Sequence, residues 1–412
     1  MTRLTRWEWR ALIAALALLA GLRIAVAQLL KLPIESDGEA YLLMAQVMAQ
    51  GGPPADQYGQ FAFYSIGYPL LLTPFVALFG GGIGTIVFAN AILALISGCL
   101  VFSVARAMGL RPIHAVLAVG LFALWIPGLW NSAQAAKENF STPLLLLLLL
   151  ATLILARGGG LRWAAIAGVA YGMGLLTGGS TLLLFAIPLL AIAIGRRGDL
   201  KKALAQCGVC GASAAAMLAP WLLATTLALG SPVLNSNGGF NLYLGNNPAA
   251  TGRFVSIADT PAGADWEKLR AKRGEIGASD ELADRAKAHI LEHPLDTLLL
   301  AGKKLVLFWV PNLPDAQDFA DAPLIAQLRI LEVTQFLLLV VGGGLGLATS
   351  VSDRRGAWLC TGTIGLFWVL HAAAYIIVRY RDPIMPILLI GATALSVRLA
   401  EMLRQKRLAH VS

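Results

Sequence analysis

The chain has 412 residues, of which 57% are hydrophobic and only 13% are charged. Soluble globular domains carry about twice that charged fraction, so lipid is the expected main solvent of this chain. The formal net charge of +9 does not indicate nucleic-acid binding. Most of the basic residues lie in the connections between apolar segments and are not gathered in a single patch. The four cysteines all lie inside apolar segments, so the sequence predicts neither a disulfide framework nor a zinc ribbon.

Apolar segments of spanning length predict an all-α integral membrane protein with about ten transmembrane helices. Two further apolar segments, 68–80 and 295–310, are too short to span and are predicted to be interfacial or re-entrant helices. The ten predicted spans lie at residues 11–30, 84–105, 112–129, 140–156, 163–178, 180–195, 203–223, 328–349, 357–378 and 383–399.

The basic residues predict the orientation of these spans. One alternate set of connections holds nearly all of them, from the N-terminal arginines to the tail around Arg404 to Arg407, and short cytoplasmic loops carry such an excess. Both termini are therefore expected in the cytoplasm, with the polar loops outside. This divides the chain into an N-terminal transmembrane module at 1–223 with a first outer loop at 31–67, an outer region at 224–327, and a C-terminal transmembrane module at 328–412.

The first outer loop is predicted to open a helix at its acidic segment. Ser36 and Glu39 have the spacing of a capping box ahead of an apolar stripe that begins at Tyr41. Asp37 falls in the first turn, where the helix dipole favours an ionised carboxylate that can accept a proton. Ordinary capping chemistry is the alternative explanation for an acid at this position.

The outer region contains one further predicted helix, from Ser279 to His293, which ends before Pro294. His289 and His293 lie one helical turn apart and could hold a metal, but no third ligand with suitable spacing is evident.

Several segments match a known family in the family's order, on one side of the membrane. They are Asp37 with Tyr41, Tyr64-Ser65-Ile66-Gly67-Tyr68-Pro69-Leu70, Lys137-Glu138-Asn139, Pro220-Trp221, residues 237–252, and residues 379–386 with the sequence RYRDPIMP. In these the chain resembles the GT-C membrane glycosyltransferases, in the branch that includes the protein O-mannosyltransferases and the lipid A aminoarabinose transferases. Two segments depart from the pattern: Gly178 and Gly179 stand where bacterial members often carry a basic residue, and Leu222 to Thr225 where they often carry Arg-Asn.

The resemblance implies a GT-C-like helical bundle in the cytoplasmic (inner) membrane that transfers a sugar from a polyprenyl-phosphate donor. The acceptor would be a lipid, a glycan or a protein on the outer side, and membrane lipids would surround the site. By analogy with the family, Asp37 is the general base, and a single displacement inverts the anomeric centre. The substrate-positioning residues implied are Tyr41, Tyr64, Tyr68, Glu138, Asn246 and Tyr380.

Arginines at the head of the last span are the leading candidates for binding the donor phosphate. The guanidinium groups of Arg379 and Arg381 can form paired hydrogen bonds with phosphate oxygens. Lys303 and Lys304, on the apolar segment at 295–310, could contact the same phosphate. For all four residues, snorkelling of a basic side chain to the interface is the alternative. A divalent cation such as Mg²⁺ or Mn²⁺ at the donor phosphate is a further possibility.

Other functional classes remain open at this point. A transporter or lipid flippase is the main rival, although such proteins tend to show two related halves with broken spans. A non-catalytic subunit with the same fold, or a lipid-linked glycan ligase or polymerase, would share the topology. The transferase hypothesis requires that Asp37 and Arg379 meet in one cleft at the lipid boundary.

Overall fold

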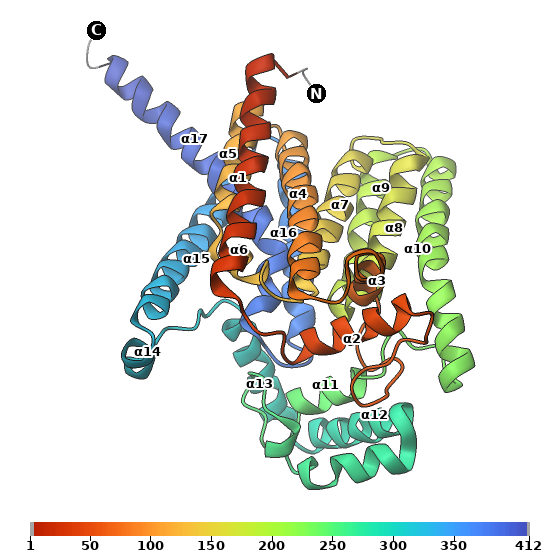
Figure 1. The fold of residues 1–412 in the computed structure, drawn as a ribbon. Helices are drawn as coiled ribbons and strands as arrows, with labels where there is room; N and C mark the ends of the chain where they lie inside the picture. Colours follow the sequence, from red (N-terminus) through yellow and green to blue (C-terminus); the bar gives the residue numbers. More distant parts are fainter. Residues whose placement is uncertain (1–3, 410–412) are drawn as a thin grey trace.

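The computed structural model describes residues 4–409, in which every regular element is helical apart from a single β-bridge between Arg253 and Ile376 (Figure 1). The N-terminal end of α1 and the C-terminal end of α17 lie at the same end of the molecule. The helices that match the predicted spans are α1 (Arg6–Leu30), α4 (Ile83–Ala107), α5 (Pro112–Ala123), α7 (Glu138–Leu155), α8 (Leu161–Thr177), α9 (Ala186–Gly195), α10 (Leu200–Leu229), α15 (Pro323–Thr349), α16 (Arg354–His371) and α17 (Met385–Ala409).

The predicted all-α, multi-pass membrane architecture is confirmed, but the count of ten spans is not. Within the described residues, six helical segments are long and apolar enough to cross a membrane: Arg6–Leu30, Ile83–Ala107, Glu138–Leu155, Leu200–Leu229, Pro323–Thr349 and Val378–Leu408. Others are shorter because the chain breaks them. The predicted span at 112–129 is divided into α5 and α6 (Ile126–Asn131), and α9 is preceded by the 3₁₀ turn η1 (Gly179–Phe185).

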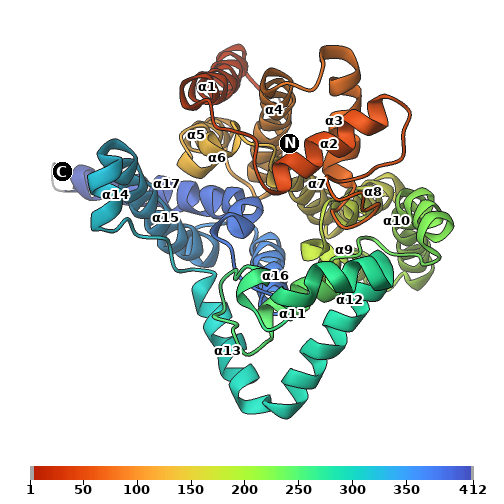
Figure 2. The ribbon, with the colours of Figure 1, turned by 60° about the horizontal axis from the view of Figure 1, so that its bottom comes forward.

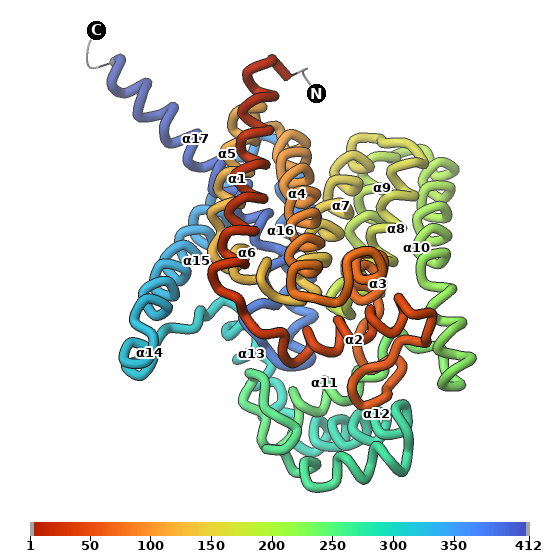
Figure 3. Tube along the Cα trace, viewed as in Figure 1, coloured from red at the N-terminus to blue at the C-terminus, as the bar shows by residue number. Residues whose placement is uncertain are grey.

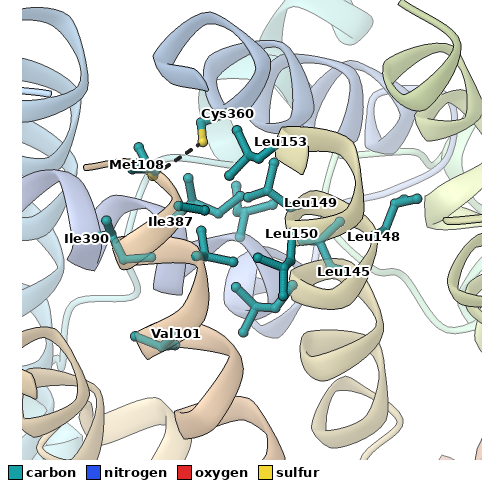
Figure 4. Close-up of a cluster of buried hydrophobic side chains, with 14 of the residues drawn as sticks. Val101, Met108, Leu145, Leu148, Leu149, Leu150, Leu153, Cys360, Ile387 and Ile390 are labelled. Atoms are coloured by element: carbon teal, nitrogen blue, oxygen red, sulfur yellow. Dashed lines mark hydrogen bonds between the residues drawn. The ribbon is translucent and has the colours of Figure 1, made fainter. Parts of the chain in front are cut away.

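The centre of the bundle is α7, whose leucine run is buried on all sides. A helix that is apolar all round needs apolar partners all round, and α7 packs against α4, α8, α9 and α16. Figure 4 shows Leu145, Leu149 and Leu153 of α7 facing Val101 of α4, Met108 directly after α4, and Ile387 and Ile390 of α17. This core holds the N-terminal end of α7, and therefore Glu138, in a defined place.

The remaining helices cover the end of the bundle opposite to the two chain ends (Figures 1 and 2). In Figure 2, α12 and α13 meet in a V beneath α11 and α16. A second 3₁₀ turn, η4, leads into α17. The covering elements and turns are α2 (Asp37–Ala49), α3 (Gly67–Phe79), α11 (Gly238–Gly245), η2 (Ile257–Asp259), η3 (Gly263–Asp265), α12 (Trp266–Glu292), α13 (Pro294–Leu307), α14 (Ala316–Asp321) and η4 (Val378–Ile384).

Two sequence predictions about helix starts are wrong. Ser36 precedes α2, but its φ is 56° and its side chain makes no capping hydrogen bond, so the capping box with Glu39 does not form. Ser279 does not start a helix, because α12 begins at Trp266 and continues through a break at Gly274, whose φ is 68°. The Ser279 hydroxyl instead accepts a hydrogen bond from the Gly239 N–H, at 3.1 Å.

The first outer loop is fastened to α12 by a carboxylate. Glu275 accepts hydrogen bonds from the backbone N–H groups of Phe61 and Ala62, at 2.8 and 2.7 Å, and from the Ser236 hydroxyl, at 2.6 Å. Figure 3 shows the trace between α2 and α3 descending to α12. A charged acceptor strengthens each of these bonds, so Glu275 holds the loop that carries Tyr64 against α12.

Candidate active site

Asp37 begins α2 and points toward the last transmembrane segment. Arg379 Nη2 donates a hydrogen bond to Asp37 Oδ2 at 2.5 Å. Both side chains are about one third exposed, at 34% for Asp37 and 31% for Arg379. The predicted convergence of these two residues is confirmed. No capping box forms at the start of α2. The Asp37 carboxylate is bound instead by Arg379.

Arg379 lies between two carboxylates. Its Nε is 3.5 Å from Glu138 Oε1, and the Glu138 side chain is only 5% exposed. This separation allows ionic attraction, but Arg379 Nε and Glu138 Oε2 are both buried without a hydrogen-bond partner. Glu138 therefore pairs with Arg379 and not with the neighbouring Lys137. The cluster retains hydrogen-bonding capacity that a ligand could satisfy.

Three tyrosines of the first outer loop and its helices form an aromatic wall beside Asp37. The Tyr41 ring meets the rings of Tyr64 and Tyr68 edge to face, each with centroids 5.7 Å apart. Burial, with the Asp37 carboxylate as a second cause, raises the pKa of Tyr41 well above its usual value, so its hydroxyl stays neutral. Tyr68 is fully buried and donates to Asn90 Oδ1 at 2.9 Å, which makes it part of the packing beneath the site.

The two arginines of η4 face different surroundings. Arg381 is buried, with its guanidinium carbon 3.6 Å from the centroid of the Phe336 ring, and it donates to the Phe308 carbonyl at 3.3 Å. A 3₁₀ turn places residues two apart on different sides, so only Arg379 reaches the Asp37 cluster. The prediction that Arg381 binds phosphate finds no support in this arrangement.

Lys303 and Lys304 also lie apart from the cluster. Lys303 is exposed on α13, whereas Lys304 is 1% exposed and donates to Asn246 Oδ1 at 3.1 Å. Burial lowers the pKa of Lys304 to about 8. Asn246 in turn donates to the Ala373 carbonyl at 2.9 Å. Lys304 and Asn246 thus join α13, α11 and the segment after α16, and neither lines the cavities described next.

Two cavities lie on either side of the Arg379 segment. A polar cavity of about 220 Å³ contains Lys137, Glu138 and Tyr380 in its wall, together with three asparagines, Asn235, Asn237 and Asn241. An apolar cavity of about 430 Å³ lies among α1, α6, α15 and η4, and Arg379 is in its wall. Substrates of different polarity could therefore approach Arg379 and Glu138 from two directions.

Sequence reasoning missed two residues that shape this site. Lys137 was noted only as part of the Lys-Glu-Asn match, although it lines the polar cavity. Its position next to Glu138, itself a predicted site residue, was the sequence signal that could have identified it. Glu275 carried no local signal, because its partners Phe61 and Ala62 are more than 200 positions away in the sequence.

The histidine pair on α12 does not extend to a metal site in the described part of the chain. The rings of His289 and His293 are 4.8 Å apart between centroids. Between residues 4 and 409, no group of three or more His, Cys, Asp or Glu side chains is placed to hold a metal ion.

Comparison with known proteins bears on the fold that carries this site. Residues 65–223 match the family model described as dolichyl-phosphate-mannose-protein mannosyltransferase. The oligosaccharyltransferase AglB of Archaeoglobus fulgidus, in complex with an inhibitory peptide and a dolichol-phosphate, superposes with a TM-score of 0.54 at 15% sequence identity over 99% of this chain. The apo form of the same organism's oligosaccharyltransferase gives a TM-score of 0.56 at 15% identity over 98% of this chain.

The chain has the GT-C fold. The resemblance predicted from its motifs is thereby confirmed. The chain spans only 52% of the length of these oligosaccharyltransferases. ArnT of Cupriavidus metallidurans bound to undecaprenyl phosphate gives a TM-score of 0.47 at 12% identity, covering 95% of this chain and 78% of ArnT. No curated protein sequence matches the chain.

Proposed function

We propose that this protein is a membrane glycosyltransferase that moves a sugar from a polyprenyl-phosphate donor to an acceptor at the outer side of the cytoplasmic membrane. The observation that carries the proposal is the Asp37, Arg379 and Glu138 cluster, which lies between two cavities of different polarity in a GT-C fold. The outer region at 224–327 would cover this site, and the modules at 1–223 and 328–412 would hold it in the bilayer.

The Asp37 carboxylate would serve as the general base. It would take the proton from the acceptor hydroxyl as that oxygen attacks the anomeric carbon, while the bond from the anomeric carbon to the phosphate oxygen breaks. The bonding electron pair would leave with the phosphate, so no general acid is required. One displacement of this kind inverts the anomeric centre.

Arg379 would control the availability of Asp37. In the structure its guanidinium is bound to Asp37 and attracted by Glu138. An incoming donor phosphate would compete with Asp37 for the guanidinium N–H groups, because phosphate oxygens accept paired hydrogen bonds from arginine well. The carboxylate released in this way could accept the acceptor proton, and Arg379 would stabilise the departing phosphate.

The distribution of charge supports the proposed side of the membrane. The N-terminal end of α1 and the C-terminal end of α17 lie at one end of the molecule, and Asp37, α2 and α12 lie at the other. The excess of Lys and Arg in the loops at the first end favours the cytoplasm for that end. The site would then face the outer side, where lipid-linked sugars and not nucleotide sugars are the available donors.

The test is sugar transfer by the purified, full-length protein. It is incubated in detergent with defined polyprenyl-phosphate sugars and candidate acceptors, and release of polyprenyl phosphate is measured. We expect release by the wild type, loss of release in Asp37→Asn, and unchanged release in Glu39→Gln, which removes an exposed carboxylate from the same helical turn. Release by Asp37→Asn at the wild-type rate would exclude Asp37 as the base, and no release from any donor would contradict the proposed activity.

A further inference from the structure

The positive charge of Arg379 is already compensated before any substrate binds. Asp37 Oδ2 is 2.5 Å from its Nη2, and Glu138 Oε1 is 3.5 Å from its Nε. Two carboxylates against one guanidinium leave this cluster with an excess of negative charge. A phosphate group arriving there needs a further cation, because two carboxylates would otherwise repel it.

The lysine next to Glu138 has the placement that such a cation requires. Lys137 is half-buried and lines the polar cavity. Its side chain forms no ion pair or hydrogen bond with any other residue in the described range 4–409. The other candidate lysines differ, since Lys304 is bound to Asn246 and lines neither cavity, and Lys303 is exposed. Lys137 is therefore a cation that faces a cavity without a protein partner.

Gly178, the residue before η1, lies next to the Lys137 ammonium group. A methyl group built on Gly178 would lie 3.5 Å from Lys137 Nζ and 3.8 Å from Ser180 Oγ. Gly178 has an extended backbone with φ 171°, which any residue can adopt. At Gly179, an added methyl group would meet nothing within 4 Å. The ammonium group thus lies close to the backbone at the start of η1, with open space at Gly179.

The rest of the polar cavity wall suits a phosphorylated sugar. Asn235, Asn237, Asn241 and Ser180 offer neutral donors and acceptors. Glu138 Oε2 is buried and unpartnered, and it could accept a hydrogen bond from a sugar hydroxyl. One free cation together with several amide groups can bind one anionic group and the hydroxyls attached near it.

We propose that the polar cavity binds the phosphate of the lipid-linked donor and that Lys137 is the residue that neutralises it. This inference rests on the proposed function and adds to it the place of the donor headgroup. The phosphate would lie beside Lys137, Glu138 and Tyr380 in the wall of this cavity, and Glu138 is in turn 3.5 Å from Arg379. Lys137 would hold the phosphate charge, and Arg379 would be attracted toward that charge and away from Asp37.

The experiment measures binding and requires no sugar transfer. Undecaprenyl phosphate is titrated into the purified full-length protein in detergent, and bound lipid is counted by native mass spectrometry. Undecaprenol, which lacks the phosphate, and inorganic phosphate are the other two ligands. We expect Lys137→Ala to weaken undecaprenyl phosphate binding roughly tenfold or more, with undecaprenol binding unchanged. Lys272→Ala, which removes an exposed lysine of α12, is the matched control and should bind like the wild type.

A second variant separates the charge from the fold. In Lys137→Ala/Gly178→Lys the ammonium group is supplied from position 178, where an added Cβ would lie 3.5 Å from the wild-type Lys137 Nζ. Binding of undecaprenyl phosphate should then recover to within about threefold of the wild type, as expected when the same charge contact re-forms. Wild-type affinity in Lys137→Ala, or no recovery in a double variant whose melting temperature matches the wild type, would overturn the proposal. The proposal would also be overturned if Lys137→Ala weakened the binding of inorganic phosphate but not the binding of undecaprenyl phosphate. If undecaprenyl phosphate binds and undecaprenol does not, but no sugar is transferred, the polar cavity remains the proposed phosphate site. Only the proposed transferase activity is then contradicted.

Discussion

Arg379 donates a hydrogen bond to Asp37 across 2.5 Å, although the two residues are 342 positions apart in the sequence. The contact joins the first outer loop to the turn that begins the last membrane segment. It brings a carboxylate able to accept a proton next to a guanidinium able to bind phosphate. Glu138 approaches the same guanidinium from the start of α7, so three separate parts of the chain meet at one charge cluster.

Arg379→Gln should remove most transfer activity. The substitution takes away the cation between Asp37 and Glu138 and the proposed stabiliser of the leaving phosphate, and we expect initial rates of polyprenyl phosphate release to fall on the order of 100-fold. Arg253→Gln is the control, since Arg253 donates to Asn312 in an exposed contact and lines neither cavity. Equal rates for Arg379→Gln and the wild type would remove Arg379 from the mechanism.

Lys304 should make the stability of the protein depend on pH. Its pKa is lowered from about 10.5 to about 8 by burial, so the unfolded chain binds more protons than the folded chain between these values. Stability linked to Lys304 therefore rises as the pH increases from 8 to 10.5, by up to about 3 kcal/mol. Thermal unfolding should show the wild type gaining stability relative to Lys304→Met between pH 7.5 and 10. A constant difference between the two proteins over this interval would contradict the prediction.

Glu275→Ala should release the first outer loop from α12. The substitution leaves two partly buried backbone N–H groups and the Ser236 hydroxyl without their acceptor, which costs up to about 1 to 3 kcal/mol for each group left unpaired. We expect faster hydrogen exchange at Phe61 and Ala62, and a lower melting temperature. Glu292→Ala, at the exposed end of the same helix, provides the comparison, and equal exchange in both variants would exclude a fastening role for Glu275.

The predicted orientation can be tested with two exposed lysines at opposite ends of the bundle. Lys272 lies on α12, and Lys201 lies at the start of α10. A maleimide that cannot cross the cytoplasmic membrane should label Lys272→Cys when it reaches the outer face of that membrane. It should label Lys201→Cys only after the cytoplasmic membrane has been broken. The parent chain with its four cysteines gives the background. The reverse labelling pattern would place the site in the cytoplasm.

Several local features could be predicted from the sequence because their causes are local. Asp37 lies in the first turn of α2 as predicted, although the Ser36 cap from which this start was argued does not form. Arg23 donates to the Gly128 carbonyl, as expected of a charge deep in an apolar helix, which must find a protein partner. The predictions about Ser36 and Ser279 were wrong because a capping pattern is a local preference that tertiary contacts can override.

The sequence by itself determined that this is a helical membrane protein, which segments are apolar, and that Asp37 and Arg379 lie at helix ends, because hydrophobic periodicity and charge placement act over a few turns of chain. Only the tertiary structure decided that Arg379 and not Arg381 reaches Asp37, that Lys304 is buried against Asn246, and that Lys137 faces a cavity. These outcomes depend on how distant helices pack, and side-chain direction at a junction of three segments is set by that packing and not by the residues on either side.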